Sequence, residues 1–213
     1  MSKGQAQVVT AVLLAGIIVA GVSAVYTWGV PLLQKNQDIK SLQGSLDDLR
    51  QLESAIETVA QRGGSNEVSF AVNDGQLRVL PDDNAIVYSV RTKAAYVSTT
   101  EWVPLNENDM RGIEEANRSS AYGINGRDKP GVIIGKAFRQ GEGYRSVYRL
   151  EFRELQDLNS DRGYIIDIQT TGDQEASGGT HQITIEKVNS ITEEGASKTG
   201  GPLVRRIIRI QVQ

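Results

Sequence analysis

The sequence predicts an α+β protein, in which one long N-terminal α-helix precedes an antiparallel β-sandwich. Three observations lead to this fold class. No charged side chain occurs between Gly4 and Gln34, and apolar residues then recur every three or four positions as far as Val59. From Glu67 onward the apolar period becomes two, which is typical of strands with one buried face.

The composition excludes several classes of site. The chain has 213 residues, a net charge of −3, a single histidine and no cysteine. Disulfides, thiolate nucleophiles and cysteine-ligated or multi-histidine metal sites are therefore excluded. The near-neutral charge argues against nucleic-acid binding, because tracking a phosphate backbone requires a clustered basic surface. We expect neither a cofactor nor catalytic residues.

The apolar segment is long enough to cross a membrane. Val8 to Leu33 holds 19 hydrophobic residues in 26. As a helix it would span about 39 Å, whereas the hydrocarbon layer of a bilayer is about 30 Å thick. A cleaved secretory signal has a shorter apolar run, of about 7 to 15 residues. We therefore expect residues 5–34 to form a retained apolar helix that inserts into the membrane.

Small residues repeat along this helix and share one side of it. The stripe consists of Ala11, Ala15, Gly16, Ala20 and Ala24. Such stripes allow helix backbones to approach closely in an apolar medium, although Ala and Gly are also common in membrane helices generally. Gly29 and Pro31 predict a bend or local melting, since proline lacks the backbone N–H.

Residues 35–62 predict an amphipathic extension of the same helix. Its narrow apolar stripe comprises Ile39, Leu42, Leu46, Leu49, Leu52, Ile56 and Val59, and charged residues lie between these positions. Gly63-Gly64 should end the helix after Arg62. From Val8 to Arg62 the helix would be about 82 Å long. A coiled-coil stalk is the alternative interpretation of this half.

The remaining residues, 63–213, predict the β-sandwich. Alternating residues at 68–72, 77–79 and 86–90 predict a three-stranded meander, with a hairpin turn at Asn73-Asp74-Gly75. Further strands are expected at 94–99, 132–138, 144–155, 164–170, 182–188 and 203–212. In the 144–155 strand, Arg145, Arg149, Glu151 and Arg153 alternate with apolar residues, which predicts a sheet buried on one face only. Residues 106–131 show no period and predict a surface excursion with a helical turn near 113–117.

The N-terminal residues, the long helix and the all-β domain together resemble a known family. Lys3-Gly4-Gln5 before a long apolar helix resembles the class III signal of type IV pilins and archaellins. In that family a prepilin peptidase cuts after the glycine, so the resemblance implies that residues 1–4 are a leader. The bacterial pattern has a glutamate at the fifth mature position, where this chain has Val9, and this departure favours the archaeal branch. The all-β domain also resembles the archaeal subunits in architecture.

This resemblance implies a structural function. The chain is expected to be an archaeal type IV pilus-like subunit, membrane-inserted as a precursor and then assembled with copies of itself into a cell-surface filament. Its partners would include the prepilin peptidase and the pilus assembly machinery. The alternative is a membrane-anchored extracellular protein that binds a ligand, or serves as a pilus or S-layer accessory, and does not polymerise. Adhesion and motility would use the same subunit plan.

Four short motifs indicate a function only weakly. Asp157 to Asp161 has the alternating oxygen ligands of a calcium loop, but Arg162 and Ile168 replace the required Gly and Glu, which favours a hairpin turn. Residues 195–201 lack the glycine that a phosphate loop needs before Lys-Thr and predict a hairpin loop. His181 has no nucleophile nearby in the sequence. Asn117-Arg118-Ser119 is the one N-glycosylation sequon, which makes Asn117 a candidate glycosylation site if the domain is extracellular.

Overall fold

The computed structural model describes residues 3–72, 75–118 and 121–213. The chain divides into two compact units between Lys40 and Ser41. The predicted amphipathic extension therefore belongs mainly to the second unit, which also holds all the strands.

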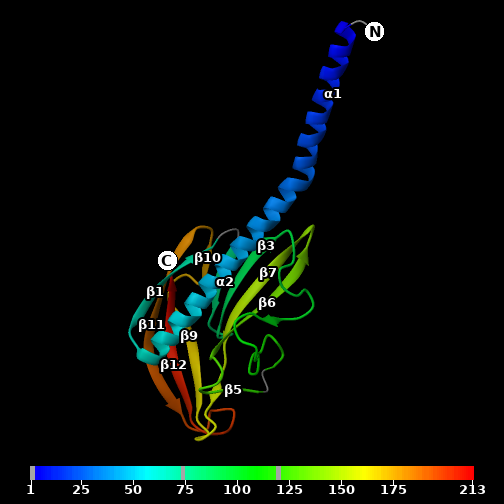
Figure 1. Ribbon diagram of the computed structural model, residues 1–213. Helices are drawn as coiled ribbons and strands as arrows, with labels where there is room; N and C mark the ends of the chain where they lie inside the picture. Colours follow the sequence, from blue (N-terminus) through cyan, green and yellow to red (C-terminus); the bar gives the residue numbers. More distant parts are fainter. Residues whose placement is uncertain (1–2, 73–74, 119–120) are drawn as a thin grey trace. The chain divides into compact units, whose positions relative to one another are not determined.

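The first unit is helical throughout its described residues. It contains α1 (Lys3–Ala24), a π-helical turn η1 (Val25–Gly29) and the start of α2 (Val30–Arg62). Figure 1 draws α1 in blue. An α-helix satisfies its own backbone hydrogen bonds, which is the requirement for a charge-free apolar segment outside water.

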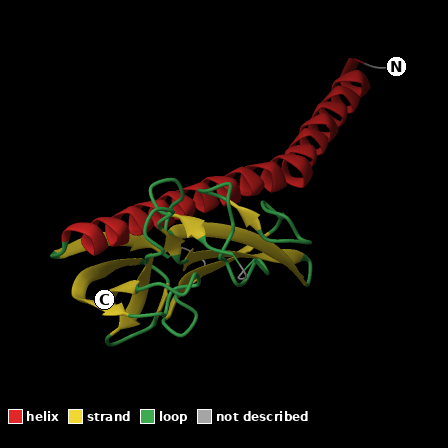
Figure 2. Cartoon of the chain, turned by 90° about the horizontal axis from the view of Figure 1, so that it is seen from below, coloured by secondary structure: helices red, strands yellow, loops and turns green. Residues whose placement is uncertain are grey.

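Within the second unit, α2 packs its apolar stripe against strands. Leu42, Leu49, Leu52 and Ile56 are at most 2% exposed, and the spacing of three or four residues places them on one helix face. Figure 2 shows this part of α2 lying along the strands. The helix ends at Arg62 as predicted, and Gly63, with φ of 79°, donates its backbone N–H to the Val59 carbonyl oxygen at 2.8 Å.

In the described part of the chain the strands form two six-stranded sheets, which agrees with the predicted α+β class. One sheet has the order β1-β11-β12-β9-β8-β5, and the other has the order β10-β2-β3-β7-β6-β4. The bounds are β1 (Ser65–Ala71), β2 (Gly75–Leu80), β3 (Ala85–Thr92), β4 (Val103–Pro104), β5 (Gly123–Ile124), β6 (Gly131–Gln140), β7 (Gly143–Phe152), β8 (Leu155–Gln156), β9 (Gly163–Thr170), β10 (Glu175–Ser177), β11 (Thr180–Glu193) and β12 (Leu203–Val212).

Both sheets and α2 contribute to one buried cluster. Phe70 of β1 meets Tyr88 of β3 edge-on with ring centroids 5.6 Å apart, and Tyr88 stacks on Tyr148 of β7 at 6.4 Å. Because Phe70 and Tyr88 belong to different sheets, this aromatic contact joins the two sheets through the core.

The predicted meander is wrong in its first step. β2 and β3 pair as an antiparallel hairpin, but β1 pairs with β11 in the other sheet. Asn73 and Asp74 of the predicted hairpin turn lie outside the described residues. The alternation of β1 identified a half-buried strand correctly, but it carries no information about the partner strand.

The antiparallel prediction is also wrong for two strand pairs. β9 pairs with β12 in parallel, and β5 pairs with β8 in parallel. Between β9 and β12 the chain enters the other sheet as β10 and returns as β11. This long connection lets β12 run in the same direction as β9, which a short hairpin cannot achieve.

Residues 94–99 do not form the predicted strand. The Ser98 hydroxyl accepts hydrogen bonds from the backbone N–H groups of Thr100 and Glu101, each at 3.3 Å. Such local side-chain bonds compete with a strand ladder. Near Ile113 the chain makes hydrogen-bonded turns, including one from the Arg118 N–H to the Ile113 carbonyl oxygen at 2.9 Å, rather than the expected helical turn.

The charged face that was predicted to be open to water is buried over most of its length. Arg149, Glu151 and Arg153 have exposed fractions of 9%, 3% and 1%, whereas Arg145 is exposed. The backbone of the predicted surface excursion bonds Glu151 and Arg153, and its Ile113 is fully buried. Alternation showed that two faces differ in polarity, but a polar face can also be buried when its charges are paired.

Candidate functional site

The apolar helix is the most distinctive surface of the chain. Every residue from Thr10 to Leu33 is exposed except Gly29, which is half-buried. Ile17 is 71% exposed and Trp28 is 79% exposed. By length and composition, this helix can cross a membrane.

The predicted packing stripe lies along α1 with open space around it. Ala11, Ala15, Gly16, Ala20 and Ala24 all fall within Lys3–Ala24. A Cβ atom added to Gly16 or to the neighbouring Gly21 would meet no atom within 4 Å. The backbone of α1 is therefore accessible to another helix at these positions.

The predicted processing motif Lys3-Gly4-Gln5 lies in the first turn of α1. The structure describes the backbone of these residues and not their side chains. Cleavage after Gly4 therefore stays a prediction.

The predicted helix break takes the form of one π-helical turn. Val25 to Gly29 is π-helical, and α2 resumes at Val30, immediately before Pro31. The Thr27 hydroxyl donates to the backbone carbonyl oxygen of Ser23. Proline cannot donate to the preceding turn, so a shift to wider hydrogen-bonded rings accommodates it without ending the helix.

A buried carboxylate joins α2 to the excursion in the second unit. Glu53 is 2% exposed, and its Oε1 accepts a hydrogen bond from Asn106 Nδ2 at 2.7 Å and lies 3.6 Å from Lys129 Nζ. Burial raises the pKa of Glu53, and the contacts with Asn106 and Lys129 oppose that rise. Sequence reasoning missed this residue because it assigned the charges of α2 to the solvent face.

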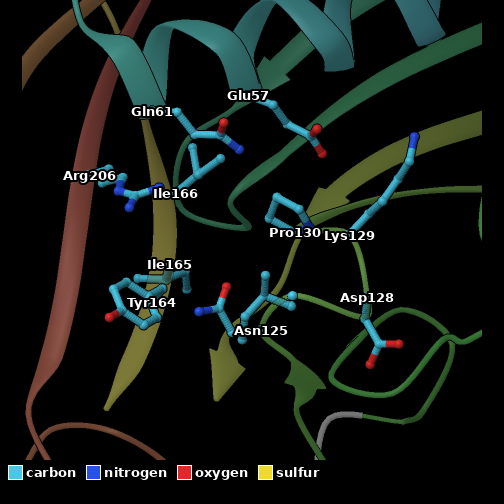
Figure 3. Close-up of a pocket in the computed structure, with 12 residues that line it drawn as sticks. Glu57, Gln61, Asn125, Asp128, Lys129, Pro130, Tyr164, Ile165, Ile166 and Arg206 are labelled. Carbon is cyan, nitrogen blue, oxygen red and sulfur yellow. The ribbon is translucent and has the colours of Figure 1, made fainter. Parts of the chain in front are cut away.

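One turn further along α2, Glu57 lines a pocket of about 410 Å³. Figure 3 shows Gln61 and Glu57 extending from the helix, with Asn125, Tyr164 and Arg206 on other walls. Burial, with a smaller contribution from the nearby Glu53 charge, raises the pKa of Glu57 to about 7. Among the described residues, nothing donates a hydrogen bond to the Oε1 atom of Glu57.

Buried Arg153, just after β7, holds the excursion in place, and buried Arg149 on β7 is paired with two carboxylates. Arg153 donates from Nη1 to the carbonyl oxygens of Asp109 at 2.6 Å and Arg111 at 2.8 Å, and from Nε to that of Lys129 at 3.0 Å. Arg149 lies 3.3 Å from both Asp83 and Glu151. The strand alternation located these arginines, but their loop partners are distant in sequence.

The weaker motifs occupy loops. Residues 157–162 connect the antiparallel pair β8 and β9, which confirms the predicted hairpin turn. Both Asp157 carboxylate oxygens accept bonds within this turn, from the Asn159 N–H and the Ser160 hydroxyl. Residues 194–202 connect the hairpin of β11 and β12, as expected. No group of three metal-ligating side chains occurs in the part of the chain that the structure describes.

The possible glycosylation site is exposed. Asn117 has a left-handed backbone with φ of 55° and is open to solvent. The third residue of its sequon, Ser119, lies outside the described residues. His181 bonds the Gly178 carbonyl oxygen at 2.9 Å at the beginning of β11.

In the comparison with known families, residues 3–113 match DUF7289, a family of unknown function. The chain belongs to this family. The DUF7289 match includes all of α1, η1 and α2 together with β1 to β4, so the apolar helix and its amphipathic continuation fall within the family's shared region. Neither the curated proteins nor the solved structures gave a match.

Proposed function

We propose that this chain is the structural subunit of an extracellular filament of the archaeal type IV pilus kind, assembled through its apolar N-terminal helix. The observation that carries the proposal is the exposed, charge-free surface from Thr10 to Leu33. Removing apolar surface from water contributes a favourable free energy of roughly 25 cal/mol per Å². Such a helix therefore requires either lipid or other helices around it.

Both environments belong to the proposed pathway. The precursor would lie in the membrane with the segment 8–33 crossing the bilayer, and the prepilin peptidase would remove residues 1–4. The assembly machinery would then move the helix from lipid into a bundle of identical helices. This transfer keeps the apolar residues out of water at every stage.

The small-residue stripe supports helix-on-helix assembly in particular. Without a hydrophobic driving force between helices in lipid, association depends on close packing, which small residues allow. The open space around Gly16 and Gly21 is available for a neighbouring helix. The two-sheet domain, which we interpret as a β-sandwich, would form the outer wall of the filament at the cell surface.

The first experiment is imaging of native material. Surface extracts from cells that make the protein are examined by negative-stain electron microscopy with an antibody against the strand domain. We expect labelled filaments, and N-terminal sequencing of the filament protein should begin at Gln5. Membrane-bound protein without labelled filaments, or an intact Met1, would reject the proposal.

A pair of variants tests the role of the stripe. Gly16→Leu places a large side chain on the stripe, whereas Val12→Leu enlarges a side chain that is already 67% exposed. Both substitutions keep the helix apolar, so membrane insertion should be unchanged. We expect Gly16→Leu to abolish filaments and Val12→Leu to leave them intact. Equal filament yields from the two variants would contradict packing through the stripe.

The alternative function is a membrane-anchored binding or pilus or S-layer accessory protein that does not polymerise. The pocket beside Glu57 is the observation that favours it. Imaging separates the two functions, because an anchored monomer gives no filaments.

A further inference from the structure

The pocket beside Glu57 is built entirely within the second unit. Its walls come from the last turns of α2, residues 125–130, β8, β9 and β12. Its volume of about 410 Å³ lies within the range of about 300 to 1,000 Å³ that is typical of small-molecule sites. Figure 3 shows labelled side chains of α2, of residues 125–130, of β9 and of β12 around this common space.

Several polar groups of the pocket have unused hydrogen-bonding capacity. Among the described residues, nothing hydrogen-bonds the side-chain amides of Gln61 or Asn125 or the guanidinium group of Arg206. The Arg206 guanidinium instead lies over the Tyr164 ring, 5.6 Å from its centroid. Each amide side chain can donate and accept hydrogen bonds. It therefore suits hydroxyl groups, because a hydroxyl also donates and accepts.

The charges of the pocket nearly cancel. Asp128 accepts the Ile124 N–H at 2.7 Å and lies 3.1 Å from Arg111, and Lys129 lies 3.6 Å from Glu53. These two side chains are therefore occupied by the protein itself. One acid, Glu57, and one base, Arg206, remain, so the pocket gives no strong preference for an ion of either sign.

The remaining wall is apolar. Pro130, Leu155, Ile165 and Ile166 line it, beside the Tyr164 ring. A ligand that fits this pocket therefore carries an apolar face and several neutral groups that both donate and accept hydrogen bonds. A saccharide ring has this combination, because its C–H bonds form an apolar face and its hydroxyls surround the edge.

We propose that this pocket binds a neutral saccharide ring, with Gln61 and Asn125 bonding its hydroxyls and Tyr164 and the adjacent apolar wall contacting its C–H face. The proposal does not depend on filament assembly, because every lining residue belongs to the strand-bearing unit.

The test uses the full chain in detergent micelles, produced in a bacterium so that it carries no N-glycan. Saturation-transfer NMR is recorded with methyl α-glucoside, methyl α-mannoside, methyl β-galactoside and N-acetylglucosamine. Cyclohexanecarboxylate is the matched probe with an apolar ring and no hydroxyls. We expect transfer to the ring protons of at least one saccharide and none to cyclohexanecarboxylate.

Variants locate the binding. Gln61→Ala and Asn125→Ala should each weaken binding about three- to tenfold, corresponding to the loss of one hydrogen bond. Gln51→Ala is the control, because Gln51 is also an exposed glutamine of α2 but does not line the pocket. Gln61 is exposed on the helix, so its replacement leaves the fold intact. No transfer to any of the four saccharides, or equal binding by Gln61→Ala and Gln51→Ala, would overturn the proposal.

The ring could come from a free or surface-attached glycan, or from a glycan on a second copy of this chain. Native material distinguishes these sources when it is tested before and after enzymatic glycan removal. Saccharide binding that appears only after removal indicates that glycans of other copies occupy the pocket. Equal binding before and after indicates an external glycan.

Discussion

The side-chain amide of Asn84 donates a hydrogen bond of 2.7 Å to the carbonyl oxygen of Ile166. Asn84 lies in the turn between β2 and β3 of one sheet, and Ile166 lies on β9 of the other. The same amide donates to Phe152 at 3.1 Å and accepts the Ile168 N–H at 2.9 Å. One residue thus joins the two sheets through three backbone groups.

We expect Asn84→Ala to lower the free energy of unfolding by about 1 to 3 kcal/mol, because partly buried backbone groups lose their partners. Asn84 also has a left-handed backbone, with φ of 50°, which alanine tolerates poorly. Asn117→Ala is the control, since Asn117 has φ of 55° and is exposed. Urea unfolding of the full chain in detergent measures both variants. Equal losses would show that backbone strain, and not the link between sheets, accounts for the effect.

The stability of the domain should fall as pH rises from about 4.5 to about 7. The pKa of Glu57 is raised from 4.5 to about 7 in the folded protein, so the folded state holds this proton more tightly than the unfolded state does. The stabilising contribution is complete below pH 4.5 and is lost by about pH 7. Burial raises the pKa values of Glu53 and Glu151 as well, which adds to the same trend.

Glu57→Gln isolates the contribution of Glu57 to that pH dependence. Its advantage over the wild type in unfolding midpoint should grow between pH 4.5 and 7 and stay constant at higher pH. Glu67→Gln, on β1, replaces an exposed carboxyl group and serves as the control. An advantage of Glu57→Gln that is independent of pH would contradict the raised pKa.

Arg153→Met should destabilise the domain by about 3 kcal/mol or more, because three carbonyl oxygens lose charged donors in a buried site. The excursion should also become sensitive to limited proteolysis between 105 and 130. Arg127→Met is the control, since the Arg127 side chain is 72% exposed. Unchanged proteolysis of Arg153→Met would show that other contacts hold the excursion.

A charge on the apolar helix should prevent membrane retention. Ile17→Lys places a lysine near the middle of the apolar segment, at a cost of roughly 2.5 to 3.5 kcal/mol on insertion scales. Leu158→Lys is the matched control, because Leu158 is 70% exposed and Ile17 is 71% exposed, but Leu158 lies on a loop of the strand domain. Membrane fractionation of the two variants should differ, with only Ile17→Lys reduced in the pellet. Equal retention would mean that residues 8–33 do not anchor the chain.

The sequence alone determined the elements whose pattern is local. The charge-free run before Lys35 identified the apolar helix, the spacing from Leu42 to Val59 identified its buried face, and Gly63 marked its end within one residue. The bounds of β12 were also predicted, because the alternation of apolar and polar residues within a strand can be recognised without knowing its partner strand.

The tertiary structure decided which segments meet. Nothing near β1 in the sequence indicates that it pairs with β11, and nothing near β9 indicates that it lies parallel to β12. In the sequence pattern, Glu53 and Arg153 occupy positions that are typical of solvent-facing residues, but in the structure the excursion buries both. The physical reason is that backbone pairing and burial of a charge depend on partners remote in the chain, whereas periodicity reports only on neighbouring residues.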